Sequence, residues 1–322
     1  MNRDIAIDLS AVIFSVRDDQ PRVLTVPPAA GGDSDALPSG PFDADQHRTL
    51  ELGLRSWVNQ QTGQDLGYVE QLYTFADEGR DPREHDGGPR LVSVAYLGLG
   101  MEAPSGDGQQ GRSNCYRFLP WEDWRAERPA MIDDMRSRLI AWTKTAPDAA
   151  QARQRRERVD ICLGLGQSGW DGFKVLERYE LLYEAGLVNE ALRDSGASAQ
   201  TPTKDGFGEA MAYDHRRMLA TALARVRGKL RYRPVVFELL EPEFTLNRLQ
   251  RVVEALAGLP LHKQNFRRLV DRGGLVEGTG KQDASTGGRP AELFRFRREV
   301  LRERRAPGVS TIMGPGRQRR GS

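Results

Sequence analysis

Residues 241–298 read EPEFTLNRLQRVVEALAGLPLHKQNFRRLVDRGGLVEGTGKQDASTGGRPAELFRFRR, and this stretch decides how the C-terminal part of the chain is interpreted. Its first half predicts a short helix after Thr245, a residue type that caps helix N-termini through its hydroxyl oxygen. From there, Leu249 and Leu256 fall at helical spacing on one apolar face. Gly258, followed two residues later by a proline, ends this helix and forces a tight turn.

A second helix is predicted directly after the turn, because Phe266, Leu269 and Val270 again share one apolar side. Two glycines, Gly273 and Gly274, end it. The opposite side is polar and basic, and it carries His262, Lys263, Gln264, Asn265, Arg267, Arg268 and Arg272. A helix that enters the major groove of DNA reads bases with such side chains, since Asn pairs with adenine and Arg with guanine.

Two short strands are predicted next, at residues 275–276 and 293–296, around a Gly-rich loop that carries Lys281 and Arg289. The order helix, turn, helix, basic hairpin is the outline of a winged helix-turn-helix. Cations in the hairpin would contact phosphates, which supply affinity but no sequence information. We therefore predict double-stranded operator DNA as a partner. The predicted contacts are Lys263, Gln264, Asn265, Arg267, Arg268, Arg272, Lys281 and Arg289. The alternative is a helical hairpin whose charged face is merely solvated.

The chain has 322 residues, which predicts two or three domains. Its net charge is only +2, but from residue 206 onward Lys and Arg are twice as numerous as Asp and Glu, and acidic residues are in excess before it. This asymmetry predicts that only the C-terminal part meets a polyanion.

Cys115 and Cys162 have no metal-site spacing, so neither a zinc site nor a disulfide framework is predicted. With no signal peptide and no run of about 18 apolar residues, a cytoplasmic protein without membrane contact is expected.

The first part of the chain predicts a mixed α/β layer fold. Apolar or alternating runs predict strands at residues 5–16, 22–26, 68–75, 91–99 and 116–119. Helical spacing predicts helices at residues 46–61, closed by Gly63, and at 132–142. The remaining segments are rich in Pro, Gly and charged residues, which is typical of loops.

Four segments of this first part resemble the Nudix domain: LPSG at 37–40, GLRSWVNQQTG at 53–63, YVEQLYTFADEGRDPR at 68–83 and RLVSVAYLGL at 90–99. In that family a loop–helix–loop carries a Glu pair just before a Gly, and these carboxylates hold Mg²⁺ against a diphosphate. The paired carboxylates are required because a hard cation such as Mg²⁺ needs several anionic oxygen ligands before it can bind substrate phosphates.

The paired carboxylates are missing here. If Gly63 is the final Gly of the motif, the Glu pair falls on Gln60 and Gln61, and the preceding Glu of the motif falls on Trp57. If Arg55 is instead the Arg of the motif, the pair falls on Asn59 and Gln60. A neutral amide oxygen is a much weaker Mg²⁺ ligand than a carboxylate, and the one carboxylate left in the helix does not make a metal site. The sequence therefore predicts a domain that kept the pocket and lost the hydrolase, with no catalytic residues and no metal site.

A degenerate Nudix domain followed by a winged helix is similar to the Nudix-related transcriptional regulators of bacterial NAD metabolism. The C-terminal half of the resemblance lies in residues 213–215 (YDH), 225–269 and 287–296 (GGRPAELFRF). The long linking segment resembles the alphaproteobacterial branch that represses de novo NAD synthesis genes. The resemblance implies a homodimeric repressor that is not an enzyme, requires no cofactor, and senses a nucleotide effector such as ADP-ribose, NAD or ATP.

The resemblance also implies where the effector lies, since Arg suits a diphosphate and an aromatic ring suits adenine. The candidate effector-binding residues are Ser39, Gly40, Tyr73, Phe75, Arg80 and Arg83. The alternative places Tyr73 and Phe75 in the sheet core and leaves Arg80 and Arg83 as exposed loop charges. The segment GLGQSG at 164–169 lacks the strand–turn–helix unit of a dinucleotide site, so it is not interpreted as one.

The predicted architecture is therefore an α/β (α+β) Nudix-like sandwich, a helical linker and a winged helix-turn-helix domain. The predicted boundaries are 1–142, 143–205 and 206–306, with a basic disordered tail at 307–322. Further helices are predicted at 143–158, 173–192 and 210–230. Two other functions remain open: an active Nudix pyrophosphatase with an accessory nucleic-acid module, and a purely structural or protein-interaction protein.

Overall fold

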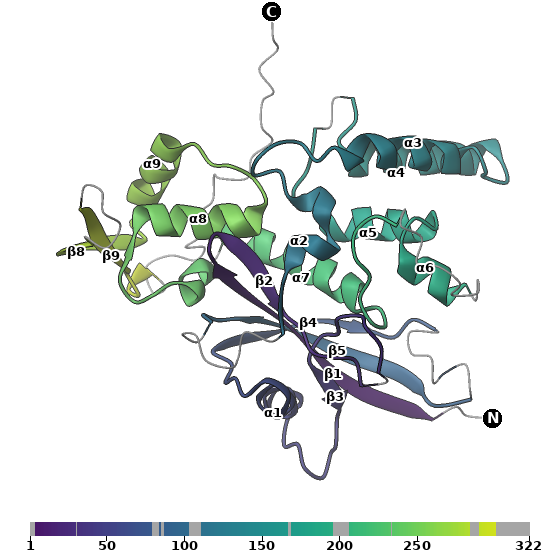
Figure 1. The fold of residues 1–322 in the computed structure, drawn as a ribbon, viewed down its shortest axis with the longest axis horizontal. Helices are drawn as coiled ribbons and strands as arrows, with labels where there is room; N and C mark the ends of the chain where they lie inside the picture. The colour runs from purple at the N-terminus through teal and green to yellow at the C-terminus, as the bar shows by residue number, and fades with distance from the viewer. Residues whose placement is uncertain are drawn as a thin grey trace, which may run out of the picture. The chain divides into compact units, whose positions relative to one another are not determined.

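The structure is a computed structural model, and it describes residues 4–29, 31–78, 84, 87–102, 111–166, 169–195, 206–232, 234–283 and 290–300. The chain forms two compact units that are interleaved in sequence (Figure 1). Unit 1 comprises Met1–Pro120 and Leu182–Ala222, and unit 2 comprises Trp121–Leu181 and Leu223–Ser322. This division differs from the domain boundaries predicted above, because the chain passes from one unit to the other three times.

Unit 1 is built on a six-stranded sheet with the order β4-β5-β1-β2-β6, to which β3 adds by pairing with β1. The strands are β1 (Ile5–Arg17), β2 (Gln20–Leu24), β3 (Ser39–Pro41), β4 (Tyr68–Phe75), β5 (Arg90–Leu99) and β6 (Arg112–Asn114). Strands β1 and β5 run parallel, and the other pairs are antiparallel. The strands predicted at 5–16, 22–26, 68–75 and 91–99 are confirmed, and the mixed sheet confirms the α/β prediction.

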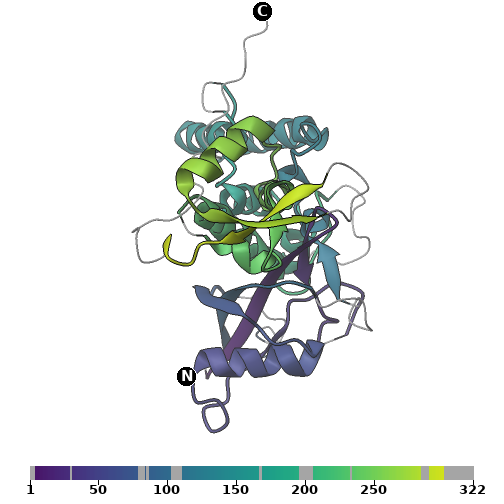
Figure 2. The same cartoon turned by 90° about the vertical axis from the view of Figure 1, so that its left-hand side faces the viewer.

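Helix α1 (Leu50–Thr62) covers one face of this sheet (Figure 2). Its Leu54 and Val58 pack against Leu9 and Ile13 of β1 in the core of unit 1. The Thr49 hydroxyl caps its start by accepting the Leu52 N–H, and Gly63 closes it in the left-handed conformation with φ 67°. The predicted helix and its closing glycine are confirmed, although the helix begins four residues later than expected.

The strand predicted at residues 116–119 is wrong, because Cys115–Phe118 forms the one-turn helix α2. Asn114 caps this turn by accepting the Tyr116 N–H. Cys115, Tyr116 and Phe118 are all buried, so their apolar run resembles that of a buried strand. A segment of this length is too short for its period to separate helix from strand.

Several predicted helices are divided by local turn signals. The segment 173–192 forms α5 (Val175–Glu184) and α6 (Asn189–Asp194), since Gly186 adopts φ 69° between them. The segment 143–158 contains the break between α3 (Met131–Thr143) and α4 (Ala149–Cys162), where Asp148 caps α4 by accepting the Gln151 N–H. Helix α7 (His215–Tyr232) covers most of the helix predicted at 210–230. Two of the three unit boundaries fall within α5 and α7, and the third falls in the 3-10 helix η3 (Pro120–Glu122).

Unit 2 contains the α3–α4 hairpin and, after α7, a winged helix-turn-helix (Figure 1). Its elements are the 3-10 helix η4 (Val235–Leu239), β7 (Phe244–Thr245), α8 (Leu246–Ala257), α9 (Lys263–Gly273), β8 (Val276–Asp283) and β9 (Ala291–Phe296). The three strands form a sheet of order β7-β9-β8. Thr245 caps α8 by accepting the Arg248 N–H, and Gly258 and Gly274 end the two helices in the left-handed conformation. The predicted helix-turn-helix and hairpin are confirmed, but β8 runs on to Asp283, so Lys281 lies on this strand and not in the predicted loop. Across the described ranges, no helix is long and apolar enough to cross a membrane.

Candidate DNA-binding surface and nucleotide pocket

Helix α9 presents one anchored apolar side and one exposed polar side. Phe266 and Val270 are each 1% exposed and fix the helix on the core of the winged helix. The exposed side contains every helix residue predicted to contact DNA: Lys263, Gln264, Asn265, Arg267, Arg268 and Arg272. A helix anchored in this way can place its polar side in a major groove without losing its own packing.

Two of these exposed residues hold each other in place. The Nη2 atom of Arg268 donates a hydrogen bond to Oδ1 of Asn265 at 2.8 Å. The bond restricts two side chains that would otherwise sample many rotamers, and it leaves the remaining guanidinium donors and the Asn265 amide nitrogen available. Restricting rotamers before binding reduces the entropy lost on binding. The pair is therefore ordered before any ligand binds.

The turn between α8 and α9 is held by two residues that the sequence analysis did not select. Glu254 Oε1 accepts the Leu261 N–H at 2.8 Å and the Gln250 amide at 2.9 Å. The Gln250 amide also donates to the Leu261 carbonyl at 2.8 Å. A Gln and a Glu four residues apart, on a helix flank that is otherwise apolar, were the available sequence signal. Together they fix the angle at which α9 leaves the turn.

Strands β8 and β9 carry cations that already have carboxylate partners. Lys281 Nζ lies 2.8 Å from Oε1 of Glu243, and Arg295 Nε lies 2.6 Å from Oε1 of Glu277. The hydrogen bond to Glu277 and its charge raise the pKa of Arg295. Both ion pairs are largely exposed and contribute little stability, so either can open when a phosphate competes for the cation. Arg289 lies outside the described residues.

In unit 1, the candidate pocket residues Ser39 and Gly40 lie on β3, next to the end of α1. The side-chain amide of Gln61 bridges the Ser39 backbone: its Oε1 accepts the Ser39 N–H at 3.2 Å, and its Nε2 donates to the Ser39 carbonyl at 2.7 Å. Gln61 is thus a structural clamp between the helix and the strand. Sequence analysis identified it only as a missing carboxylate, not as a clamp.

Trp57 fills the space beside Gly40. Its indole ring lies against Gly40, its Nε1 donates to the Pro41 carbonyl at 3.0 Å, and it makes an edge contact with His47. Glu51, a carboxylate of the same helix, forms an ion pair with Arg55 at 2.9 Å. The surface beside β3 is therefore built from an indole and an amide.

The two candidate aromatic residues have different environments. Tyr73 is 60% exposed, whereas Phe75 is 3% exposed and belongs to the core. Their rings meet edge to face with centroids 5.2 Å apart. Tyr73 is thus available to a planar ligand and Phe75 supports it from below. Arg80 and Arg83 lie outside the described residues.

Comparison with known proteins agrees with the arrangement of unit 2. Residues 236–296 match the family of NrtR DNA-binding winged helix domains. This part of unit 2 is therefore similar to the NrtR winged helix domains. The matched range covers α8, α9, both wing strands and all of η4 except its first residue, and it therefore includes every predicted DNA contact.

A curated relative matches part of the chain. The ADPR responsive transcriptional repressor NtrR of Acinetobacter baylyi is 34% identical to it over 125 residues, which is 39% of this chain. The match covers 50% of the relative, so the chain aligns with about half the length of that curated protein.

Two solved structures share the fold over most of the chain. Shewanella oneidensis NrtR complexed with a 27mer DNA has a TM-score of 0.51 at 21% identity, and the match covers 92% of this chain and 95% of that one. A MutT/nudix family protein from Enterococcus faecalis has a TM-score of 0.51 at 18% identity, covering 92% and 88%. These likenesses confirm the predicted fold class, a Nudix-like domain combined with a winged helix.

Mg²⁺, which Nudix enzymes hold at this helix, does not fit the residues of α1. Gln61, at one position of the Glu pair, uses both atoms of its amide on the Ser39 backbone. Trp57, at the preceding Glu position, is packed against Gly40. Among the residues that the structure describes, no group of three His, Cys, Asp or Glu side chains is placed to hold a metal ion. A hard cation would find amide and indole groups here rather than anionic oxygens.

The contact between Gly40 and Trp57 gives a direct test of this packing. A methyl group added at Gly40 would overlap the Trp57 ring, so Gly40→Ala is expected to destabilise unit 1 by about 1–3 kcal/mol. Thermal denaturation followed by circular dichroism measures the loss. Gly100→Ala is the matched control, because no atom lies within 4 Å of the added methyl there. Equal melting temperatures for the two variants would contradict the packing described here.

Proposed function

We propose that this protein is a transcriptional repressor that binds operator DNA through its NrtR-type winged helix domain and responds to ADP-ribose. The observation that carries the proposal is the exposed side of α9, where Lys263, Asn265 and Arg268 stand free of the core within a matched DNA-binding domain. Such side chains supply both phosphate contacts and base reading. The relative from Acinetobacter baylyi, named as an ADPR responsive repressor, supports the effector.

The Nudix-like domain is the proposed effector site, with Ser39, Gly40 and Tyr73 at its surface. NAD and ATP are the other adenine nucleotides to be compared with ADP-ribose, and genes of NAD synthesis are the proposed targets. A homodimer is proposed because two-fold symmetry of a protein matches a palindromic site. For a nucleotide to change operator affinity, it must bind one arrangement of the dimer more tightly than another.

We also infer that the Nudix-like domain does not hydrolyse its ligand. Support comes from the amides and the indole that stand where Nudix enzymes place carboxylates. The test is an assay of ADP-ribose hydrolysis with Mg²⁺, followed by release of AMP. Turnover that depends on Mg²⁺ and stops in Gln61→Ala would contradict this inference and support the alternative of an active pyrophosphatase.

The decisive experiment is a fluorescence anisotropy titration of the full chain against promoter fragments of NAD synthesis genes and against DNA selected from a random pool. ADP-ribose, NAD and ATP are added separately. Selective binding that one nucleotide weakens is the expected result and names the effector. Equal affinity for all sequences at moderate salt would overturn the repressor proposal and favour a protein-interaction role.

Breaking the ion pair between Lys281 and Glu243 is expected to raise DNA affinity, whereas removing the cation itself is expected to lower it. Glu243→Gln releases Lys281, so DNA affinity is expected to rise by about 0.2–1 kcal/mol, the strength of an exposed ion pair. Lys281→Ala should lower affinity for all sequences alike and reduce the salt slope by about one unit. Titrations between 50 and about 200 mM salt give both values. Unchanged slopes in both variants would show that Lys281 does not contact DNA.

A further inference from the structure

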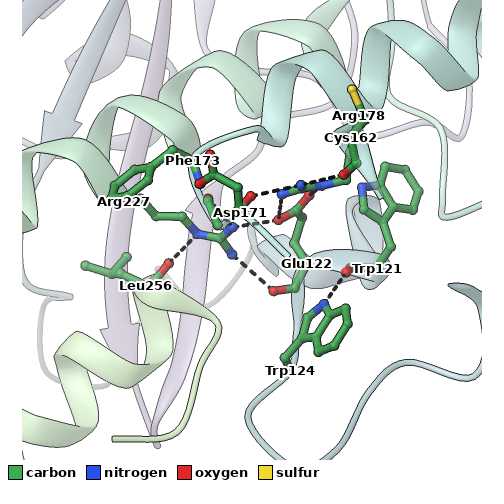
Figure 3. A network of polar contacts seen from close by, with 10 residues as sticks. Trp121, Glu122, Trp124, Cys162, Asp171, Phe173, Arg178, Arg227 and Leu256 are labelled. Atoms are coloured by element: carbon green, nitrogen blue, oxygen red, sulfur yellow. Dashed lines mark hydrogen bonds and ion pairs between the residues drawn. The ribbon is translucent and has the colours of Figure 1, made fainter. Parts of the chain in front are cut away.

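Unit 2 contains a buried carboxylate that holds two buried arginines (Figure 3). Arg178 of α5 donates from Nε and Nη2 to the two carboxylate oxygens of Glu122, at 2.6 and 2.9 Å. Arg227 of α7 donates from Nη1 to Oε2 of Glu122 at 2.6 Å. The side chains of all three residues are at most 1% exposed. We call these three residues the triad.

Each arginine of the triad also donates to backbone carbonyls. Arg178 Nη1 reaches the carbonyls of Cys162 and Asp171 at 3.0 and 2.9 Å. Its guanidinium stacks on the Trp170 ring, with 3.8 Å between Cζ and the ring centroid. Arg227 reaches the Gly172 carbonyl at 2.9 Å and the Glu122 carbonyl at 3.1 Å. The planar guanidinium is the side chain that can make several such bonds in fixed directions at once.

One bond of the triad ends on the helix-turn-helix. Arg227 Nε donates to the carbonyl of Leu256, in the last turn of α8, at 3.1 Å. Two residues further on, the Gly258 carbonyl accepts the backbone N–H of Trp124 at 2.7 Å. The last carbonyls of a helix have no partner within the helix, and a cation near them is favourable. The end of α8 is thus held by Arg227 and Trp124, which both lie outside the matched range 236–296.

The triad also lies near the points where the chain enters and leaves unit 2. The chain passes between the units at 120/121, 181/182 and 222/223, and Glu122, Arg178 and Arg227 each lie a few residues from one of these points. A single buried cluster therefore fastens every segment that makes up unit 2. Residues 121–181 are consequently a structural part of the DNA-binding unit rather than a tether.

We infer that Glu122 is a positioning residue for operator binding, acting through Arg227 on the end of α8 and so on the direction of α9. The Glu122 carboxylate holds the Arg227 guanidinium in an orientation in which Nη1 donates to Glu122 while Nε donates to the Leu256 carbonyl. Because α9 follows α8 after a turn of only a few residues, a shift at Leu256 displaces the base-reading side chains. The operator part of this inference rests on the proposed function, whereas the structural part does not.

Two variants separate the positioning role from general stability. Glu122→Gln removes the charge that orients both arginines. Arg227→Lys keeps a positive charge beside Glu122, but an ammonium has no planar fork to reach Leu256 at the same time. Glu190→Gln is the matched control: Glu190 is a buried carboxylate of unit 1 that pairs with buried Arg216 at 3.1 Å and makes no bond to α8. If Glu122→Gln does not fold, Arg227→Lys alone decides.

Hydrogen–deuterium exchange of the full chain, without DNA, measures how firmly the end of α8 and the start of α9 are held against local opening. Faster exchange of peptides covering residues 256–266 is expected in Glu122→Gln and Arg227→Lys and not in Glu190→Gln. Affinity for DNA selected by the wild type should fall about tenfold in the first two variants, the effect of one hydrogen bond with a charged partner. Wild-type exchange in both variants, or equal changes in Glu190→Gln, would overturn the inference. Wild-type protein that selects no DNA would refute the proposed function, while the exchange data would still decide the positioning role.

Discussion

Replacing Glu122 with glutamine is expected to lower the free energy of unfolding by about 3–5 kcal/mol, the usual cost of breaking a buried ion pair from one side. The amide keeps the shape of the side chain but leaves Arg178 and Arg227 charged and buried at 0–1% exposure. Neither arginine can lose its proton to escape the cost, since arginine stays charged in proteins. The effect should therefore exceed that of any single exposed ion pair in this chain.

Urea denaturation followed by tryptophan fluorescence measures this loss, because Trp121, Trp124, Trp142 and Trp170 all belong to unit 2. Asp133→Asn is a suitable control, since Asp133 pairs with Arg128 at 2.8 Å on the exposed surface and its loss should leave the transition unchanged. A transition of Glu122→Gln that coincides with the wild-type transition would show that the triad contributes nothing to stability.

The same carboxylate makes stability depend on pH. Burial alone would raise the pKa of Glu122, but the charges and hydrogen bonds of Arg178 and Arg227 hold it below its ordinary value of 4.5. A pKa that is lower in the folded state stabilises the protein above the unfolded value, and this contribution is lost as the pH falls through the folded pKa. The stability difference between wild type and Glu122→Gln should thus be constant near neutral pH and shrink below about pH 4. Denaturation series from pH 7 to pH 3 on both proteins test this. A difference that grows in acid would mean that the carboxyl is protonated in the native state.

The helix-turn-helix was predictable because its signals are local. Thr245, Gly258 and Gly274 cap their helices through bonds to neighbouring residues, so sequence spacing alone located α8 and α9. The long β-strands of unit 1 were predictable for the same reason, since the apolar runs that mark them are also local. The same reasoning failed for the one-turn helix α2, since four residues, three of them buried, do not define a period.

The triad was not predictable, because its partners are 56 and 105 residues apart in sequence. No local pattern distinguishes Glu122 or Arg227 from the many solvated charges of the chain. The interleaving of the units has the same origin, since it depends on which helices pack together. In unit 1, the motif register located Gln61, but its bond to Ser39 depends on how α1 meets β3. Likewise, the exposure of Tyr73 and the burial of Phe75 depend on how β4 packs in the sheet, and the spacing of the two residues in the sequence does not predict the difference.

The Arg268→Ala substitution on α9 is expected to reduce discrimination at one base pair of the operator by about 1–3 kcal/mol, the contribution of one bidentate contact to guanine. The structure adds a second expectation. Because Arg268 donates to Asn265 at 2.8 Å, removing either side chain also releases the other. The two substitutions should therefore not add: the double variant Asn265→Ala/Arg268→Ala should lose less affinity than the sum of the single losses, by about 0.5 kcal/mol or more.

Competition anisotropy with the wild-type site and with single base-pair variants of it measures both quantities. Arg153→Ala provides the control, since Arg153 is an exposed arginine on α4, outside the winged helix domain. Its affinity for every site should match the wild type. If Arg268→Ala instead weakens all sites equally and lowers the salt slope, Arg268 contacts a phosphate and does not read a base. If the single losses add, the bond to Asn265 does not persist on DNA, and α9 reads the operator through side chains that act independently.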